Sequence, residues 1–349
     1  MDEPHGTVED RVPAAPRRAI QEPPHRLRRR VLTVLGIALA LLLVAGAGLA
    51  YYGYQIQRAL TSNLQHNAEL PPDSSRPEPD APPQDGRHAP VDVVLMGSDS
   101  RDLSNPDAGR SDTLMVAHLS GDRQTAYLIS FPRDMYVEIP GYGQDKINAA
   151  FAYGGTALTV QTVESLLDTR MDHLAVVNFE GFIELTDAVG GITVDNEHAF
   201  SSHGYDYPEG PVELSGEKAL WYVRERYSLP NGDFDRAENQ RKVVQAIVAK
   251  GLSPQVIADP AAFTAFVSGI ASHTAVDAAL TDEVIRETAL SLRLDGASDI
   301  VLLQAPVLGT DTTASGQSID VVDFDQLAEL GEAMSSDTMD EYVAKYPPE

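Results

Sequence analysis

The sequence contains no cysteine among its 349 residues, and this absence excludes several kinds of site at once. A disulfide framework, a thiolate zinc site and a cysteine nucleophile all require cysteine side chains, so none of them is expected. Because proteins without cysteine occur in every compartment, the absence does not indicate the redox environment of the protein.

Positive charge is also scarce. Lysine and arginine together number 26 against 52 aspartates and glutamates, which gives a formal net charge of -26 at pH 7. A nucleic-acid partner requires a basic surface, so we expect no such partner, and any arginine cluster must be local. The chain is long enough, and at 43% hydrophobic residues apolar enough, to bury a sizeable core.

The first 54 residues have the pattern of a membrane anchor. Residues 1–30 carry seven arginines against five acidic residues, and residues 31–50 are apolar apart from Thr33. This run is long enough to cross a hydrocarbon core of about 30 Å, and tyrosines follow it as at a membrane interface. Because arginines before a span stay cytoplasmic, we predict a cytoplasmic tail at 1–30 and a single transmembrane helix at 31–54.

A cleaved signal peptide is the alternative interpretation of the apolar run. The apolar core of such a peptide is usually about 7–15 residues long and precedes an Ala-x-Ala cleavage site. Residues 31–50 exceed that length, although Ala45-Gly-Ala47 has the form of such a site. We therefore predict a retained anchor, which makes the protein a single-pass protein of the cell membrane with its folded part outside.

A spacer is expected between the anchor and the folded part. Residues 71–83 are rich in proline, and the segment around them has too few apolar side chains to form a core. We predict a proline-rich extracytoplasmic spacer at 55–90. It would hold a folded domain at 91–349 away from the membrane, but near enough to reach a lipid head group.

Charged side chains gather after the first predicted strand. The apolar run from Val91 to Met96 ends at Gly97, and two loops follow with four charged residues: Asp99, Arg101, Arg110 and Asp112. Mixed acids and arginines suit a phosphate bound through a divalent cation, with carboxylates on the cation and guanidinium groups on the remaining oxygens. A surface loop with ordinary ion pairs is the alternative.

The pattern beyond residue 91 predicts an α/β fold. Strand patterns at 112–119 and 124–130 flank the turn Ser120-Gly-Asp122 and predict an antiparallel pair. Other strands are expected at 173–178, 192–194 and 300–304, and helices at 157–167, 179–189, 261–272, 281–292 and 323–334. We expect residues 253–349 to complete the same domain; a separate accessory domain is the alternative.

Further arginines follow in the segment from residue 214 to 250. Ser215 is a candidate helix cap, and if the chain is extended after Tyr222, then Arg224 and Arg226 project to the same side. Residues 235–238 fit a capping box for a helix that runs to about residue 250 and presents Arg236 and Gln240 on one face. An anion near that helix N-terminus would be stabilised. Each of these arginines, taken alone, is more typical of a solvated surface. The prediction of an anion site therefore depends on several arginines converging on one place.

Several motifs together resemble the LytR-CpsA-Psr family. In chain order they are Gly97-Ser-Asp-Ser-Arg101, Gly109-Arg-Ser-Asp-Thr113, Pro132-Arg-Asp134, Asp145-Lys-Ile-Asn148, Asn178-Phe-Glu-Gly181, Gly190-Gly191, Leu214-Ser-Gly-Glu-Lys-Ala-Leu220, Tyr222-Val-Arg-Glu-Arg226 and Asp233-Phe-Asp-Arg236. The resemblance covers about residues 91–252, the motif-bearing core, and the single anchor precedes it. One departure is Asn239, where many members of the family carry a further arginine.

The resemblance implies an α-β-α sandwich with a mixed central sheet and a mostly apolar groove for a polyprenyl chain. It implies a Mg²⁺-dependent enzyme at the outer face of the membrane that transfers a glycopolymer from polyprenyl pyrophosphate to peptidoglycan. Asp99 and Asp112 are then similar to the family's magnesium ligands. The pyrophosphate-binding set implied by the resemblance is Arg101, Arg110, Arg133, Arg224, Arg226, Arg236 and Gln240.

The implied reaction is a phosphoryl transfer, in which a protein mainly positions groups and neutralises charge. A base must take the proton of the attacking sugar hydroxyl, and Asp134 is the candidate because it lies beside Arg133 at a predicted strand end. A structural partner of Arg133 is the alternative role. Hydrolysis of the same pyrophosphate by water and a non-catalytic lipid-binding or regulatory role are the alternative functions; the acidic pair disfavours the non-catalytic role.

Overall fold

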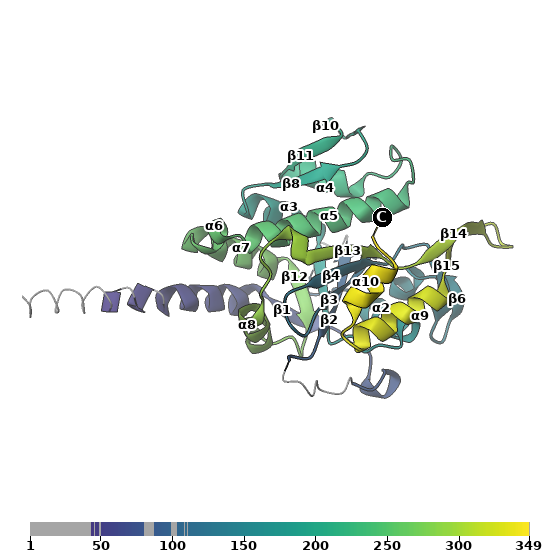
Figure 1. Ribbon diagram of the computed structural model, residues 1–349, viewed down its shortest axis with the longest axis horizontal. Coiled ribbons are helices and arrows are strands. Elements are labelled where there is room, and N and C mark those ends of the chain that lie inside the picture. Colours follow the sequence, from purple (N-terminus) through teal and green to yellow (C-terminus); the bar gives the residue numbers. More distant parts are fainter. Residues whose placement is uncertain are drawn as a thin grey trace, which may run out of the picture. The chain divides into compact units, whose positions relative to one another are not determined.

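The computed structural model describes residues 43–44, 46–48, 50–79, 87–98, 103–107, 109 and 111–348 (Figure 1). Two compact units, Met1–Tyr52 and Gly53–Glu349, are considered separately. The described residues of the first unit are helical, and among the residues described no helix is both long and apolar enough to cross a membrane. The predicted tail at 1–30 and most of the predicted transmembrane helix at 31–54 lie outside the described residues.

A mixed sheet of seven strands forms the centre of the second unit, in the order β1-β12-β7-β2-β3-β4-β13. The strands are β1 (Gln65–Ala68), β2 (Val91–Ser98), β3 (Ser111–Leu119), β4 (Ala126–Ser130), β7 (His173–Asn178), β12 (Thr274–Asp277) and β13 (Ile300–Gln304). β2 is parallel to β7 and antiparallel to β3, which is antiparallel to β4 as predicted. The continuous apolar run of β2 fits a strand that is covered on both faces. The predicted α/β class with a mixed central sheet is therefore confirmed.

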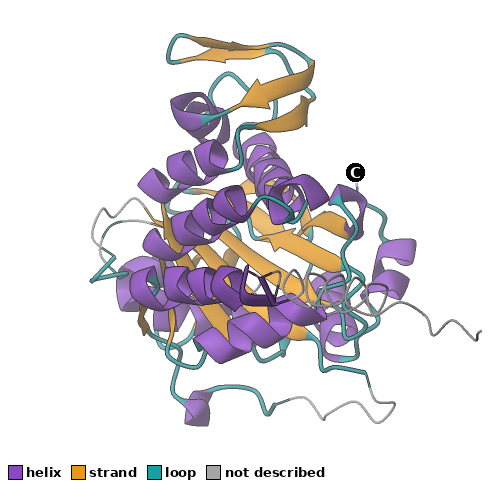
Figure 2. Ribbon diagram, turned by 90° about the vertical axis from the view of Figure 1, so that its left-hand side faces the viewer, coloured by secondary structure: helices purple, strands orange, loops and turns teal. Residues whose placement is uncertain are grey.

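Helices cover both faces of this sheet. Side chains of α2 (Ala149–Leu167), α9 (Phe324–Ser335) and α10 (Met339–Lys345) share one buried apolar cluster with the sheet. A second cluster joins α3 (Phe179–Ala188), α4 (Gly216–Arg224), α5 (Asp233–Gly251) and α7 (Pro260–Ser272). Figure 1 shows α5 running past β13 and β4, and Figure 2 shows the strands enclosed by helices.

Small elements fill the connections. Four two-stranded sheets pair β5 (Tyr136–Ile139) with β6 (Gly143–Lys146), β8 (Ile192–Asn196) with β11 (Gly210–Leu214), β9 (Phe200–Ser202) with β10 (Tyr205–Tyr207), and β14 (Val307–Thr312) with β15 (Ser318–Val322). The remaining short helices are η1 (Asp73–Ser75), α6 (Pro254–Ile257), α8 (Asp282–Ser291) and η2 (Ala297–Asp299). The predicted helices and strands between residues 253 and 349 are confirmed, and β12 and β13 join the central sheet, so this region completes the same domain.

The N-terminal half of α2 was missed because the helix is broken. The sequence predicts a helix from 157 to 167, whereas α2 begins at Ala149 and is kinked at Gly154 and Gly155. Gly155 has φ 62°, a conformation that residues with a Cβ rarely adopt. A pair of glycines in the middle of the pattern thus concealed the first turns of the helix.

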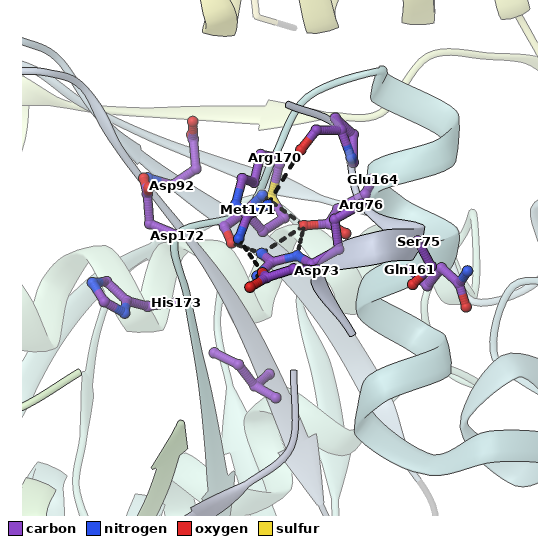
Figure 3. A network of polar contacts seen from close by, with 12 residues as sticks. Asp73, Ser75, Arg76, Asp92, Gln161, Glu164, Arg170, Met171, Asp172 and His173 are labelled. Atoms are coloured by element: carbon purple, nitrogen blue, oxygen red, sulfur yellow. Dashed lines mark hydrogen bonds and ion pairs between the residues drawn. The ribbon is translucent and has the colours of Figure 1, made fainter. Parts of the chain in front are cut away.

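The described part of the predicted spacer packs against the domain, which corrects the expectation for residues 55–79. Residues 53–63 are helical, and β1 pairs in parallel with β12. The side chain of Arg76 is only 4% exposed and forms an ion pair of 2.7 Å with Glu164 of α2 (Figure 3). Nη2 of Arg76 also donates to the carbonyl of Met171, whose N–H donates to the same glutamate. The composition alone favours an extended linker. The pairing of β1 with β12 and the buried ion pair of Arg76 with Glu164 instead hold this segment against the domain.

Candidate active site

The predicted site lies at the C-terminal ends of β2, β4 and β7. Asp99, Arg101 and Arg110 lie outside the described residues, and for Asp112 the backbone, but not the side chain, is described. The register of β2 and β3 pairs Gly97 with Thr113 and Ser98 with Ser111. This pairing brings the backbone of Asp112 next to the residue that precedes Asp99. Because Asp99 lies outside the described residues, the proximity of the two acids stays a prediction.

Arg133 and Asp134 follow β4 and lie in a small charged cluster. Oδ1 of Asp134 is 2.9 Å from Nζ of Lys146 and 3.8 Å from Nε of Arg133, and all three side chains are about one-quarter exposed. The segment is fixed by the backbone, because the N–H of Asn148 donates to the carbonyl of Arg133 at 3.3 Å. Lys146 belongs to the motif Asp145-Lys-Ile-Asn148, although no role was predicted for it.

The segment around Arg224 differs from the prediction. We expected an extended chain after Tyr222, but α4 continues through Arg224, and the first extended residue is Glu225. The helix continues because Tyr222 and Val223 are buried with the rest of its apolar face. Arg224 and Arg226 therefore do not share a strand face. The guanidinium of Arg224 lies 5.7 Å from the ring centre of Trp221.

Arg226 and Arg236 come together at Asp233 instead. Oδ1 of Asp233 is 2.7 Å from Nη2 of Arg236 and 3.8 Å from Nη1 of Arg226. Arg226 also donates from Nη2 to the hydroxyl of Tyr227 at 2.7 Å. Two predicted pyrophosphate ligands are thus held by the carboxylate of Asp233, a motif residue for which no role was predicted.

The N-terminus of α5 also differs from the prediction. The helix begins at Asp233, two residues before the expected capping box, and Gly232 with φ 59° is its N-cap. The carboxylate of Asp235 accepts hydrogen bonds from the backbone and side chain of Asn231 at 2.8 and 3.0 Å. Gln240 lies one turn beyond Arg236, and its Nε2 donates to the carbonyl of Val223 at 3.2 Å, which ties α5 to the last turn of α4.

Arg241 is a buried cation that was not among the predicted site residues. Its side chain donates from Nη1 to the hydroxyl of Ser130 at the end of β4, and among the described residues no carboxylate forms an ion pair with it. Nε has no hydrogen-bond partner within the described part of the chain. Burial lowers the pKa of the guanidinium to about 10, so it stays charged at neutral pH. No pattern of residue spacing in the sequence distinguishes Arg241 from the other charged residues of α5.

Asp320 connects the two charged groups. Its N–H donates to the carbonyl of Asp134 at 2.9 Å, and the residue is 6% exposed. Burial, followed by the negative charges of Asp134 and Asp233, raises the pKa of this carboxyl to about 6 against the opposing effect of Lys146. The structure therefore brings Arg133, Asp134, Arg226 and Arg236 into one electrostatic neighbourhood, and it adds three residues to it: Lys146, Asp233 and Asp320.

A small cavity begins at Arg133 and reaches into the core. Its volume is about 10 Å³, and it is lined by Ser111, Thr113, Leu114, Arg133, Ile147, Asn148, Phe151 and Thr159. A space of this size holds about one water molecule. Its inner wall is formed mostly by β3 and α2. The wider apolar groove for a polyprenyl chain stays a prediction.

Comparison with known proteins identifies the family. The LytR_cpsA_psr family model matches residues 52–336. The chain belongs to the LytR-CpsA-Psr family. This family match includes the segment from β1 to Arg76, in agreement with the packing of that segment on the domain.

Relatives of the LytR-CpsA-Psr chain include curated enzymes and a solved structure. The polyisoprenyl-teichoic acid–peptidoglycan teichoic acid transferase TagU of Enterococcus faecalis is 38% identical over 249 residues, which cover 71% of this chain and 79% of that protein. The protein of the same name from Bacillus subtilis strain 168 is 39% identical over 222 residues, 63% of this chain and 69% of that protein. The crystal structure of B. subtilis TagU has a TM-score of 0.52 at 31% identity and covers 72% of this chain and 97% of that chain.

Proposed function

We propose that this protein transfers a glycopolymer from a polyprenyl-pyrophosphate carrier to peptidoglycan at the outer face of the cytoplasmic membrane. Membership of the family and the similarity to proteins named teichoic acid transferases support this function. The observation that carries it is the meeting of arginines and carboxylates from the β4 loop, α5 and β15 at one end of the sheet. Because these relatives are named for teichoic acid, a teichoic acid is the first polymer to test.

The arginines bind and orient the pyrophosphate in this proposal. Arg133, Arg226 and Arg236 are brought together in the described structure, and we assign Arg101, Arg110, Arg224 and Gln240 to the same ligand from the sequence. Guanidinium groups suit this role because their planar donors bind two phosphate oxygens at once. They also stabilise the charge that accumulates on the departing polyprenyl phosphate.

We assign Asp99 and Asp112 to a magnesium ion, because carboxylate oxygens are ligands that Mg²⁺ prefers. The pairing of Ser98 with Ser111, the neighbours of these two acids in the sequence, supports this assignment. When bound, the ion would neutralise phosphate charge and polarise the bond that breaks. The protein residues then place the acceptor hydroxyl, and an acid of the cluster takes its proton; the sequence proposes Asp134 for that step.

The anchor remains part of the proposal. A helix at 31–54 with its arginine-rich end in the cytoplasm would hold the domain outside, where polyprenyl carriers and peptidoglycan meet.

The test is transfer by the full-length chain in detergent, supplied with Mg²⁺, a polyprenyl-pyrophosphate teichoic acid precursor and peptidoglycan fragments. We expect polymer to become linked to peptidoglycan in the wild type, and Asp112→Asn to reduce the rate at least about a hundredfold. Arg286→Lys, at an exposed pair on α8, is the matched control and should transfer normally. Release of free polymer without any linkage would instead favour hydrolysis.

A further inference from the structure

Three carboxylates meet at the site, and they are not equivalent. Asp134 is paired with Lys146 and Arg133, and Asp233 is paired with Arg236 and Arg226. Within the described part of the chain, Asp320 forms no ion pair. A cation in contact stabilises the ionised form of a carboxylate and makes it a weaker base. The unpaired acid is therefore the one best able to hold a proton.

The position of Asp320 is set by the backbone. β15 forms an isolated parallel bridge between Met135 and Asp320, next to the hydrogen bond from Asp320 to the carbonyl of Asp134. The residue itself is 6% exposed. Its place beside Asp134 thus does not depend on its own side chain, so the carboxylate can change charge without loss of the contact.

The charged groups that face Asp320 come from three elements. The loop after β4 supplies Asp134, α5 supplies Asp233, and β6 supplies Lys146. On β14, the residue opposite Asp320 is the uncharged Thr310, and the residue at the bridge is the uncharged Met135, just before β5. Two negative groups and one positive group therefore surround a buried acid. Burial together with the two negative groups raises its pKa to about 6, close to the pH at which a general base is most effective.

We propose that Asp320 is the group that accepts the proton of the attacking hydroxyl, and that Asp134 acts as the ion-pair partner that positions Lys146 and Arg133. This inference rests on the proposed transfer function. The hydroxyl oxygen forms a bond to the phosphorus that carries the glycopolymer, and its proton passes to the Asp320 carboxylate. The bond from phosphorus to the polyprenyl phosphate breaks, and its electron pair leaves with that phosphate. Asp320 then returns the proton to solvent.

The experiment is the pH dependence of kcat for transfer by the full-length protein. In the wild type we expect kcat to rise through about pH 6 as Asp320 ionises and then to level. Asp320→Asn should lower kcat by about 10²–10⁴-fold, leave KM nearly unchanged and remove the rise. Asp134→Asn should keep the rise but move it to lower pH, because one of the negative neighbours of Asp320 is lost.

Two further variants make the experiment decisive. Asp311→Asn, at an exposed position on β14 opposite Ile319, should behave as wild type. Asp320→Glu should keep the rise with a lower kcat, which covers the case in which Asp320→Asn does not fold. A rise retained in Asp320→Asn, or lost in Asp134→Asn instead, would overturn the assignment while the transfer function stands. A wild type that links no polymer to peptidoglycan would overturn the proposed function and this inference together.

Discussion

At the N-terminal ends of β2 and β7, buried charges are paired, whereas at the C-terminal ends of the same strands some are not. The first end holds the pair of Arg76 and Glu164 at 2.7 Å and the pair of His118 and Asp92 at 2.8 Å. The other end holds Asp320 and Arg241, which form no ion pairs in the described part of the chain. Buried charge without a partner is costly, so its presence indicates a site that a ligand completes.

The charges around Arg76, at the N-terminal ends of β2 and β7, form a network that serves the stability of the fold. Figure 3 shows Arg76 between Glu164 and the carbonyl of Met171, with Arg170 and Asp73 at its margin. His173 lies 3.3 Å from Asp277, whose Oδ2 accepts the N–H of Leu174. Each of these acids has a cationic or imidazole partner, and the contacts of Arg76 hold its segment against the domain.

The largest effect on stability should come from removal of the buried ion pair between Arg76 and Glu164. Arg76→Met leaves the carboxylate of Glu164, which is 1% exposed, without its cation. We expect the free energy of unfolding to fall by about 3–5 kcal/mol in urea titration, because one buried charge is left unpaired. Arg170→Met, whose partner Asp73 is 85% exposed, is the matched control and should lose less than about 1 kcal/mol. Equal losses in the two variants would contradict the claim that burial makes the pair of Arg76 and Glu164 the more important one for stability.

A smaller effect on stability, of opposite sign, is expected when Asp320 of the candidate active site is replaced. The folded pKa of Asp320 is about 6, above its ordinary value of 3.8, so the folded state binds the proton more tightly than the unfolded state. Stability is therefore lost as pH rises from about 4 to 6, and Asp320→Asn removes that loss. We expect this variant to be more stable than wild type by up to about 3 kcal/mol at pH 7 and nearly equally stable at pH 4. Urea titrations at the two pH values check it, and a variant less stable at pH 7 would contradict it.

The sequence predicted the framework of the site well because local signals were strong. The apolar run of β2, the turn between β3 and β4, and the end of α3 at Gly190 and Gly191 all follow from residue type and spacing. The motifs also selected Arg133, Arg226 and Arg236, whose contacts converge on the cluster. The assignments of Asp99, Arg101 and Arg110 stay predictions, because these residues lie outside the described part.

The wrong or missing predictions concern residues whose positions depend on interactions with distant parts of the chain, which local sequence patterns do not reveal. Arg224 continues α4 because the apolar face of that helix packs, which outweighs the alternation of charge in the sequence. The segment 65–79 is ordered by partners far away in the chain, β12 and Glu164. Asp320 is one acid in a hairpin without a motif, and only the bridge to Met135 brings it to Asp134. Long-range pairing of this kind is decided by the whole fold.

The central claim is that the arginines of the candidate active site bind one pyrophosphate together, as a clamp. Transfer kinetics of lysine variants test this claim most directly. Lysine keeps the charge of Arg133 or Arg236 but loses the planar pair of donors, so each variant should lose about 10- to 100-fold in kcat/KM. Arg286→Lys should be unaffected, since that side chain is 53% exposed and lies on α8.

Because both arginines act on one ligand, the double variant of Arg133 and Arg236 should lose less than the product of the two single losses. Purely additive losses, or activity equal to that of the Arg286 control in both single variants, would contradict the clamp. The predicted result is a large, non-additive loss of transfer activity at Arg133 and Arg236, with the Arg286→Lys control unchanged.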